Sequence, residues 1–395
     1  MRGVIAVLVL VGGMAAAQDR PADWKGELVV GKKSAKEITF GDQVDGKQEW
    51  FPFRGRYPIR VRDDRDGWLR VHDGHREGWA KKDEFVLSKD APAYFTDRIR
   101  ADPKDVFALM RRGIGWQNRE EYDSAIKDFD EIIRLDPRRA DAFNSRGVCR
   151  RLQEDWDRAL ADYDEAIRLE PKFVTAINNR GFVRRVTGEL DGALRDYDEA
   201  IRLDPKYTDA FHDRGMMWLL NGDFDRALKD LDEAIRLDPN GGHLVSDRAV
   251  TLFLARRPAA ADGFRAAIKL DGSSDRVVAR AVFAGTLAAR LEKDVAAGEW
   301  FLERASKLKP LWPGPIVRFL RGDLDEPGLL KLANTKSKET DARTYLGLDH
   351  VIRGNRDAAR AHFRWVKESG SRSYTEYTIA VVELARLEKG ETPKR

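Results

Sequence analysis

Residues 162–171 read DYDEAIRLEP, and residues 196–205 repeat this stretch almost unchanged as DYDEAIRLDP. The second copy begins 34 residues after the first, since 196 − 162 = 34. The same period connects Pro103, Pro137, Pro171, Pro205 and Pro239; Arg112, Arg146, Arg180, Arg214 and Arg248; and Gly113, Gly147, Gly181 and Gly215. A fixed period of this length predicts stacked copies of one supersecondary unit, because a single copy cannot bury its own apolar face.

The small and large residues of each unit suit a pair of packed helices. Each periodic glycine removes side-chain bulk where the first helix crosses the second, and Ala159 and Ala193 let the second helix approach. The aromatic residue four positions later, Tyr163 or Tyr197, lies on the same helix face and fills the gap. Each proline favours the start of the next helix. The apolar residues of the quoted stretch are therefore predicted to form the core.

The carboxylates of the quoted stretch are interpreted as structural. A metal or acid–base cluster is the functional alternative, but arginines recur with the same period and no histidine accompanies the acids. We expect Asp164 to pair with Arg168, because acid before base at a spacing of four suits a helix. We also expect a ladder between two columns: Arg112, Arg146, Arg180 and Arg214 facing Asp128, Asp162, Asp196 and Asp230.

This pattern resembles the tetratricopeptide repeat, whose period and order of Gly, Ala, aromatic, Ala and Pro it shares. The resemblance implies a mainly α fold, an α-solenoid in which helix pairs form a right-handed superhelix. Gly347, Ala359 and Phe363 reproduce the same spacing near the C-terminus. The predicted divisions are a five-repeat array at 104–272, a degenerate repeat at 273–310, an irregular connector at 311–343 with a short helix near 327–333, and a C-terminal repeat with a capping helix at 344–389.

The C-terminal part carries a further resemblance. WPGPIVRFLRG at 312–322 and YLGL at 345–348 resemble the C-terminal module of envelope tetratricopeptide lipoproteins of Gram-negative bacteria. Those proteins act as adaptors that hold cell-wall hydrolases. The single cysteine of this chain, Cys149, is far from the N-terminus, so the lipid attachment of that family is not available. The resemblance implies an envelope location and leaves the partner open.

The first residues, MRGVIAVLVLVGGMAAAQ, combine a positive start, an apolar run and an A-x-A cleavage signal. The apolar run is shorter than the ~20 residues that a membrane-spanning helix needs. This pattern predicts a cleaved signal peptide at 1–17 and a periplasmic or extracellular mature protein without a transmembrane segment. An uncleaved N-terminal anchor is the alternative.

Residues 24–89 have a β pattern instead of the helical one. It is clearest in GWLRVHDGHREGW at 67–79, where apolar and polar residues alternate on both sides of a turn. This stretch resembles the bacterial SH3-like domain, which implies a small β-barrel, followed by a linker at 90–103. The candidate ligand face of this domain comprises Trp50, Tyr57, Trp68 and Trp79, and the alternative role of these aromatic residues is the barrel core.

Composition and motifs argue against several classes of function. The 71 Lys and Arg residues are nearly balanced by 67 Asp and Glu residues, so no basic stripe for nucleic acid is expected. Ser124 and Lys127 match a Ser–Lys nucleophile spacing without its partner motifs, and Gly26 to Lys33 is an incomplete phosphate-binding loop. His72 and His75 are interpreted as solvated turn residues. We therefore predict no catalytic residue, no metal site and no cofactor.

A binding surface remains, formed by the first helix of each repeat. Asparagine and arginine in such a groove suit an extended peptide, because they can bind its backbone or a carboxylate. The candidate groove residues are Met110, Arg111, Asn144, Arg151, Asn178, Asn179, Phe182, Arg185, His212 and Met216. The sequence thus predicts an exported, non-enzymatic scaffold that holds a protein or peptide in its groove, while the SH3-like domain docks a second partner or a cell-wall component. The alternative is a structural envelope protein that self-assembles through its C-terminal helices.

Overall fold

The computed structural model describes residues 28–32, 39–44, 47–52, 59–72, 77–270, 275–305 and 312–390. The predicted signal peptide lies outside these residues. The chain divides into two compact units, Met1–Cys149 and Arg150–Arg395, which are described separately below. Among the described residues, no helix is long and apolar enough to span a membrane.

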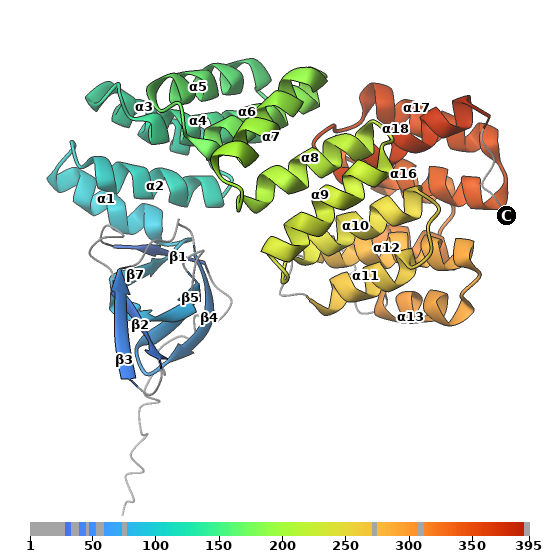
Figure 1. Cartoon of the computed structure of the whole chain (residues 1–395), viewed down its shortest axis with the longest axis horizontal. Coiled ribbons are helices and arrows are strands. Elements are labelled where there is room, and N and C mark those ends of the chain that lie inside the picture. Colours follow the sequence, from blue (N-terminus) through green and yellow to red (C-terminus); the bar gives the residue numbers. More distant parts are fainter. Residues whose placement is uncertain are drawn as a thin grey trace, which may run out of the picture. The chain divides into compact units, whose positions relative to one another are not determined.

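The first unit begins with a seven-stranded antiparallel sheet (Figure 1). Its strands are β1 (Leu28–Gly31), β2 (Thr39–Val44), β3 (Lys47–Pro52), β4 (Ile59–Arg65), β5 (Trp68–His72), β6 (Glu77–Lys81) and β7 (Phe85–Leu87). Their order in the sheet is β3-β2-β6-β5-β4-β1-β7. Asp66 and Gly67 both have positive φ between β4 and β5, as a tight Asp-Gly hairpin turn requires. Leu69, Val71 and Ala80 are fully buried on one face.

A helix, α1 (Ala91–Ala101), occupies the interval in which the sequence analysis predicts a linker. Ala91 and Phe95 are fully buried in one cluster with Ala108 of the next helix. Arg98 binds Asp105 at 2.7 Å and so fixes the bend between the two helices. The prediction of a linker at 90–103 is therefore corrected to a packed helix. The 34-residue pattern does not extend over this segment, which is why the repeat argument misses it.

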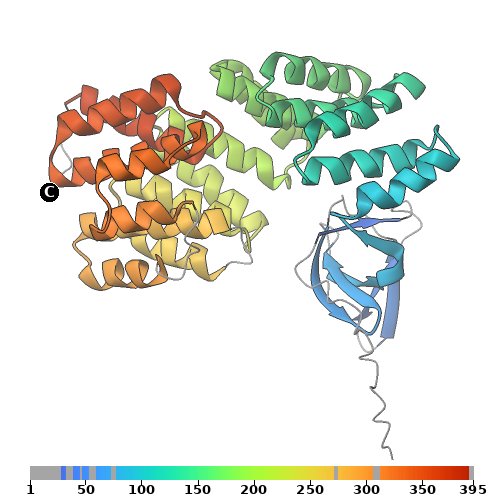
Figure 2. The same ribbon diagram turned by 180° about the vertical axis from the view of Figure 1, so that it is seen from behind.

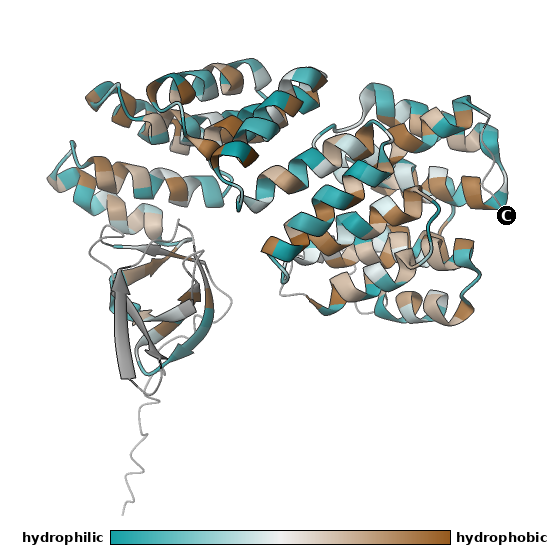
Figure 3. Ribbon diagram, in the orientation of Figure 1, coloured by the Kyte–Doolittle hydropathy of each residue, from teal (hydrophilic) through white to brown (hydrophobic). Residues whose placement is uncertain are grey.

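The repeat array follows as consecutive helix pairs. Its helices are α2 (Val106–Asn118), α3 (Tyr122–Leu135), α4 (Ala140–Leu152), α5 (Trp156–Leu169), α6 (Val174–Thr187), α7 (Leu190–Leu203), α8 (Thr208–Leu220), α9 (Phe224–Leu237), α10 (Gly242–Leu254) and α11 (Ala260–Lys269). Hydrophobic and hydrophilic residues alternate along each of them (Figure 3). A Cβ at Gly181 would lie 2.9 Å from the Tyr197 ring, and one at Gly113 would lie 2.7 Å from the Phe129 ring. The periodic glycines thus allow the close helix contact that the sequence predicts.

The arginine–aspartate ladder is confirmed for three pairs. Within single helix pairs, the joined groups are Arg112 and Asp128 at 2.6 Å, Arg180 and Asp196 at 2.7 Å, and Arg214 and Asp230 at 2.7 Å. The same column of arginines also binds the second helix of the preceding pair: Arg146 to Asp130, Arg180 to Asp164, Arg214 to Asp198 and Arg248 to Asp232. The ladder therefore links neighbouring repeats as well as the two helices of one repeat.

One expected contact differs in the structure. Arg168 pairs with Glu165 at 2.6 Å, and Asp164 binds Arg180, so the predicted pair of Asp164 and Arg168 is wrong. The three-residue spacing brings Glu165 onto the guanidinium with two hydrogen bonds. Asp162 is buried and accepts a hydrogen bond from Arg150 at 2.9 Å.

The second unit ends in seven further helices: α12 (Asp275–Glu292), α13 (Val295–Ala305), α14 (Gly314–Arg321), α15 (Glu326–Leu332), α16 (Lys336–Arg353), α17 (Arg356–Ser369) and α18 (Thr375–Glu388). A Cβ at Gly285 would clash with Phe301, and one at Gly347 would clash with Phe363. Both glycines lie 16 residues before their ring, as Gly181 does before Tyr197. The two outlying segments therefore contain the same helix pair. The connector predicted at 311–343 is largely helical, because Ile316, Val317 and Leu320 bury a face of α14.

Candidate binding site

The ten predicted groove residues are divided between the two units. Met110 and Arg111 of α2 and Asn144 of α4 belong to the first unit, and all three are partly buried. The other seven belong to the second unit: Arg151 at the end of α4, Asn178, Asn179, Phe182 and Arg185 on α6, and His212 and Met216 on α8. Met216 is buried in the hydrophobic core.

Arg151 and Arg185 both lie against the ring of Phe182. Their guanidinium carbons lie 4.8 and 5.0 Å from the centroid of that ring. The Nε atoms of both arginines are buried without a hydrogen-bond partner, and neither arginine makes an ion pair with a residue that the structure describes. The arginines of the ladder, in contrast, bind aspartates. We call Arg151, Phe182 and Arg185 the arginine stack.

Asn178 lies one turn before Phe182 on α6 and is itself buried. Its amide nitrogen donates to the carboxylate of Asp213 at 2.8 Å, whereas its amide oxygen is buried without a partner. Burial and the charge of Asp213 raise the pKa of Tyr197, so this phenol stays protonated. On this side, the arginine stack therefore adjoins hydrogen-bonding groups that include the Asn178 amide and the Asp213 carboxylate.

The C-terminal helix covers the next part of the array. α18 packs against α8 and α10, and the three helices lie side by side in both views (Figure 1, Figure 2). Glu383 of α18 is fully buried and binds Arg256 at 2.9 Å and Arg386 at 2.6 Å. Before α18, Arg372 donates to the carbonyl oxygen of Val186 at 3.4 Å. Partner access to α8 and α10 is therefore restricted by the chain's own C-terminus.

A buried charge network holds this contact together. Asp247 of α10 accepts from Arg280 at 2.7 Å and lies 2.9 Å from the Nε2 atom of His212. Arg280 also binds Glu376, at the start of α18, at 3.1 Å. Burial acts to raise the pKa of Asp247, but the charge of Arg280 and the hydrogen bond with His212 have the opposite and larger effect. The net pKa of Asp247 is about 2, below its ordinary value. Burial lowers the pKa of His212, whereas its hydrogen bond and ion pair with Asp247 raise it above the ordinary value.

In the first unit, the strand register aligns several predicted aromatic positions on one face of the sheet. Trp68 is opposite Lys81, and Arg70 is opposite Trp79, on β5 and β6. Cross-strand partners share a face, so these four residues lie on the face opposite the buried Leu69 and Ala80. Trp68 and Trp79 are partly buried. Trp50 lies on β3 opposite Gly41, and Tyr57 lies outside the described residues.

The structure describes two of the histidine and cysteine positions that the sequence draws attention to, His72 and Cys149. His72 ends β5, while Asp73 and His75 lie outside the described residues. Cys149 is buried in the core of the first unit, and its Sγ atom lies 3.7 Å from the Oε1 atom of Gln117.

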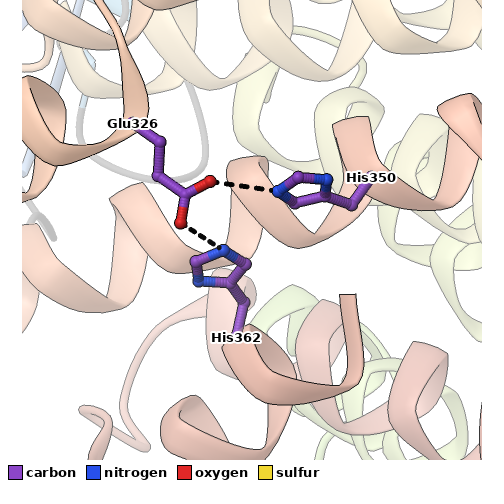
Figure 4. A group of neighbouring side chains, drawn as sticks. All are labelled: Glu326, His350 and His362. Atoms are coloured by element: carbon purple, nitrogen blue, oxygen red, sulfur yellow. Dashed lines mark hydrogen bonds and ion pairs between the residues drawn. The ribbon is translucent and has the colours of Figure 1, made fainter. Parts of the chain in front are cut away.

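The sequence analysis missed one side-chain cluster in the C-terminal helices (Figure 4). Glu326 of α15 lies between His350 of α16 and His362 of α17. Its two carboxylate oxygens are 3.1 Å and 3.0 Å from the respective Nε2 atoms. One ligand atom from each residue can be chosen so that all three lie within 4.8 Å of one another. The spacings of 24 and 12 residues fit no metal motif, so only the fold reveals this group.

Comparison with known proteins finds a family match for part of the array. A family model described as "Tetratricopeptide repeat" matches residues 116–172 and 182–242. No curated protein matches the chain. A tetratricopeptide repeat protein from Parabacteroides merdae is 14% identical over 71% of this chain and 98% of its own, with a TM-score of 0.45. Pseudomonas aeruginosa PilF is 18% identical over 55% and 97%, with a TM-score of 0.46. PilW, a type IV pilus biogenesis factor, is 16% identical over 55% and 98%, with a TM-score of 0.49.

Proposed function

Because the chain contains tetratricopeptide repeats, we propose that it is a protein-binding scaffold whose arginine stack holds an acidic or carboxylate-terminated peptide segment of a partner. One observation carries this proposal. Arg151 and Arg185 lie against one ring, and neither has a carboxylate partner among the described residues. Every ladder arginine shown above binds at least one aspartate. A bound carboxylate would supply the missing counter-charge.

The physical chemistry of the stack suits an anion. Arg185 is only 9% exposed, and a buried charge without a counter-ion is unfavourable. A guanidinium can bind a carboxylate with two parallel hydrogen bonds, which are stronger than neutral ones. Phe182 keeps both guanidinium groups in place by cation–π contact, which stabilises each by roughly 0.5–1 kcal/mol at an exposed site. Asn179 directly follows Asn178 on α6 and is partly buried. Its side-chain amide can bind the backbone of a peptide.

The same proposal includes a location and a second contact. The N-terminal pattern at 1–17 supports export to the periplasm or the cell exterior. The β pattern at 24–89 and the shared face of Trp68 and Trp79 support an SH3-like domain that docks a second partner or a cell-wall component. The role proposed for the chain is binding, without catalysis of its own.

Peptide binding tests this function directly. Fluorescein-labelled peptides of equal length would be compared by fluorescence anisotropy, one pool rich in Asp and Glu with a free C-terminus, the other rich in Asn and Gln with an amidated C-terminus. We expect the acidic pool to bind more tightly, and the difference to decrease with salt. In the double variant Arg151→Gln/Arg185→Gln, we expect at least about tenfold weaker binding, since hydrogen bonds to charged groups contribute about 1.5–3 kcal/mol each.

Arg158→Gln is the matched control, because Arg158 is an exposed arginine of α5 that binds nearby Asp155 at 2.8 Å. It should bind both pools as the wild type does. Equal affinity for the acidic and neutral pools would contradict the proposed site. So would a double variant that binds the acidic pool with wild-type affinity while retaining its circular dichroism spectrum.

A further inference from the structure

We propose that Glu326, His350 and His362 form a binding site for one divalent transition metal ion of the zinc class. The three side chains come from three different helices and converge on one point (Figure 4). Two imidazole nitrogens and one carboxylate are a common ligand set for zinc, which leaves one position of a tetrahedral ion for water. Magnesium and calcium prefer oxygen ligands alone, so the two histidines favour a transition metal.

The structure already brings the three ligand atoms close together. Both histidines face the carboxylate with their Nε2 atoms, at 3.1 Å and 3.0 Å. Their rings are nearly parallel, with an interplanar angle of 11° and centroids 5.5 Å apart. An ion bound by both Nε2 atoms requires rotation of at least one ring, because an imidazole binds a metal in its own plane, and displacement of the Glu326 carboxylate. Its side chain is 37% exposed, so this movement meets little resistance.

The surroundings favour a ligand set that an ion can reach. His362 is only 6% exposed, and its Nε2 atom is turned toward the Glu326 carboxylate at 3.0 Å. His350 is 19% exposed and, together with Glu326, leaves the site open to solvent. The positive charge of Arg343 also acts on His362, but the guanidinium of Arg343 binds Glu339 at 2.8 Å. The carboxylate that completes the set would offset the ion's charge in part.

A bound ion would connect α15 to the last repeat-like helix pair. Glu326 is the first residue of α15, whereas His350 and His362 belong to α16 and α17. In the structure, the Glu326 carboxylate between the two imidazoles makes this connection. Zinc would replace this carboxylate bridge with stronger bonds between the metal and the three side chains. Because the ion would bind only the folded state, zinc should raise the melting temperature of the protein.

Isothermal titration calorimetry with zinc chloride tests the proposal, using the full chain with any affinity tag removed. We expect one saturable site per chain. Glu326→Gln and His350→Gln should each weaken zinc binding by at least about tenfold, because even outer-shell changes cost 10–100-fold at such sites. Both substitutions are at partly exposed positions, so folding should be retained, as circular dichroism would verify. Cobalt added in place of zinc should give the visible absorption of a low-coordinate nitrogen–oxygen site, and both variants should lose it.

His243→Gln is the matched control, since His243 is an exposed histidine outside the cluster. It should bind zinc as the wild type does. Three results would overturn the proposal: no saturable site in the wild type, wild-type zinc affinity in both cluster variants, or displacement of zinc by equimolar magnesium.

Discussion

Arg180 binds two aspartates that differ in burial and in the number of arginines that they bind, and this offers a test of the ladder. Asp196 is on the second helix of its own repeat, with a side chain that is 5% exposed. Asp164 is on the preceding repeat, with a side chain that is 56% exposed. Both are within 2.8 Å of the same guanidinium. The substitutions Asp196→Asn and Asp164→Asn remove one negative charge each while preserving side-chain volume.

The structure predicts very different losses of stability. Asp196 accepts hydrogen bonds from Arg180 at 3.1 and 2.7 Å and from Arg184 at 2.7 Å. Removing one partner of a fully buried ion pair costs about 3–5 kcal/mol. The side chains of Arg180 and Arg184 are 19% and 25% exposed, so water recovers part of this energy. We therefore expect about 2–3 kcal/mol for Asp196→Asn. For the exposed Asp164, we expect no more than about 1 kcal/mol.

Equilibrium unfolding in urea, followed by circular dichroism, would measure the free energy of unfolding of both variants and the wild type. Unchanged slopes with urea would show that the same cooperative transition is compared. High salt should reduce the effect of Asp164→Asn more than that of Asp196→Asn, since exposed pairs are screened more strongly. Equal losses in the two variants, or a larger loss for Asp164→Asn, would refute the reasoning from burial.

Two further predictions concern the C-terminal half. Gly347→Ala should lower the free energy of unfolding by about 1–3 kcal/mol, because the new methyl group overlaps the ring of Phe363; a melting curve identical to wild type would contradict the close helix contact. The raised pKa of His212 stabilises the folded state below its unfolded pKa of about 6.5, and this contribution is lost as pH rises through the folded value. The stability difference between wild type and His212→Gln should therefore shrink as the pH rises above about 6.5 in urea titrations. A difference that stays constant would show that the ion pair with Asp247 is not responsible.

The sequence predicts the periodic part of the fold because each repeat places the same residue in the same environment. Gly181 meets Tyr197 as Gly113 meets Phe129, so one physical argument applies to every copy. The same reasoning finds the helix pair around Gly347, far outside the regular array. The approximate position of the short helix α15 is also predicted correctly, at Glu326–Leu332.

Contacts between sequence-distant residues could not be predicted. Glu383 binds Arg256 across 127 residues, and no period relates the two positions. The docking of α18 on α8 and α10 depends on such pairs, so the groove residue His212 is found in a buried network with Asp247. Helix α1 was missed because its burial depends on Phe95 meeting the first repeat. The difference between Arg185 and the ladder arginines, which bind aspartates, likewise depends on three-dimensional contacts that the sequence does not show.

Site-specific photocrosslinking tests the central claim most directly, namely that the arginine stack receives a partner's acidic segment. Benzoylphenylalanine would replace Phe182 in cells that produce the protein, and position 168, on the outer side of α5, would carry the same group as a control. We predict that crosslinking from position 182 captures a peptide with Asp, Glu or a free C-terminal carboxylate at the attachment point, and that Arg185→Gln abolishes the product. No crosslink from position 182, or the same product from position 168, would contradict the claim.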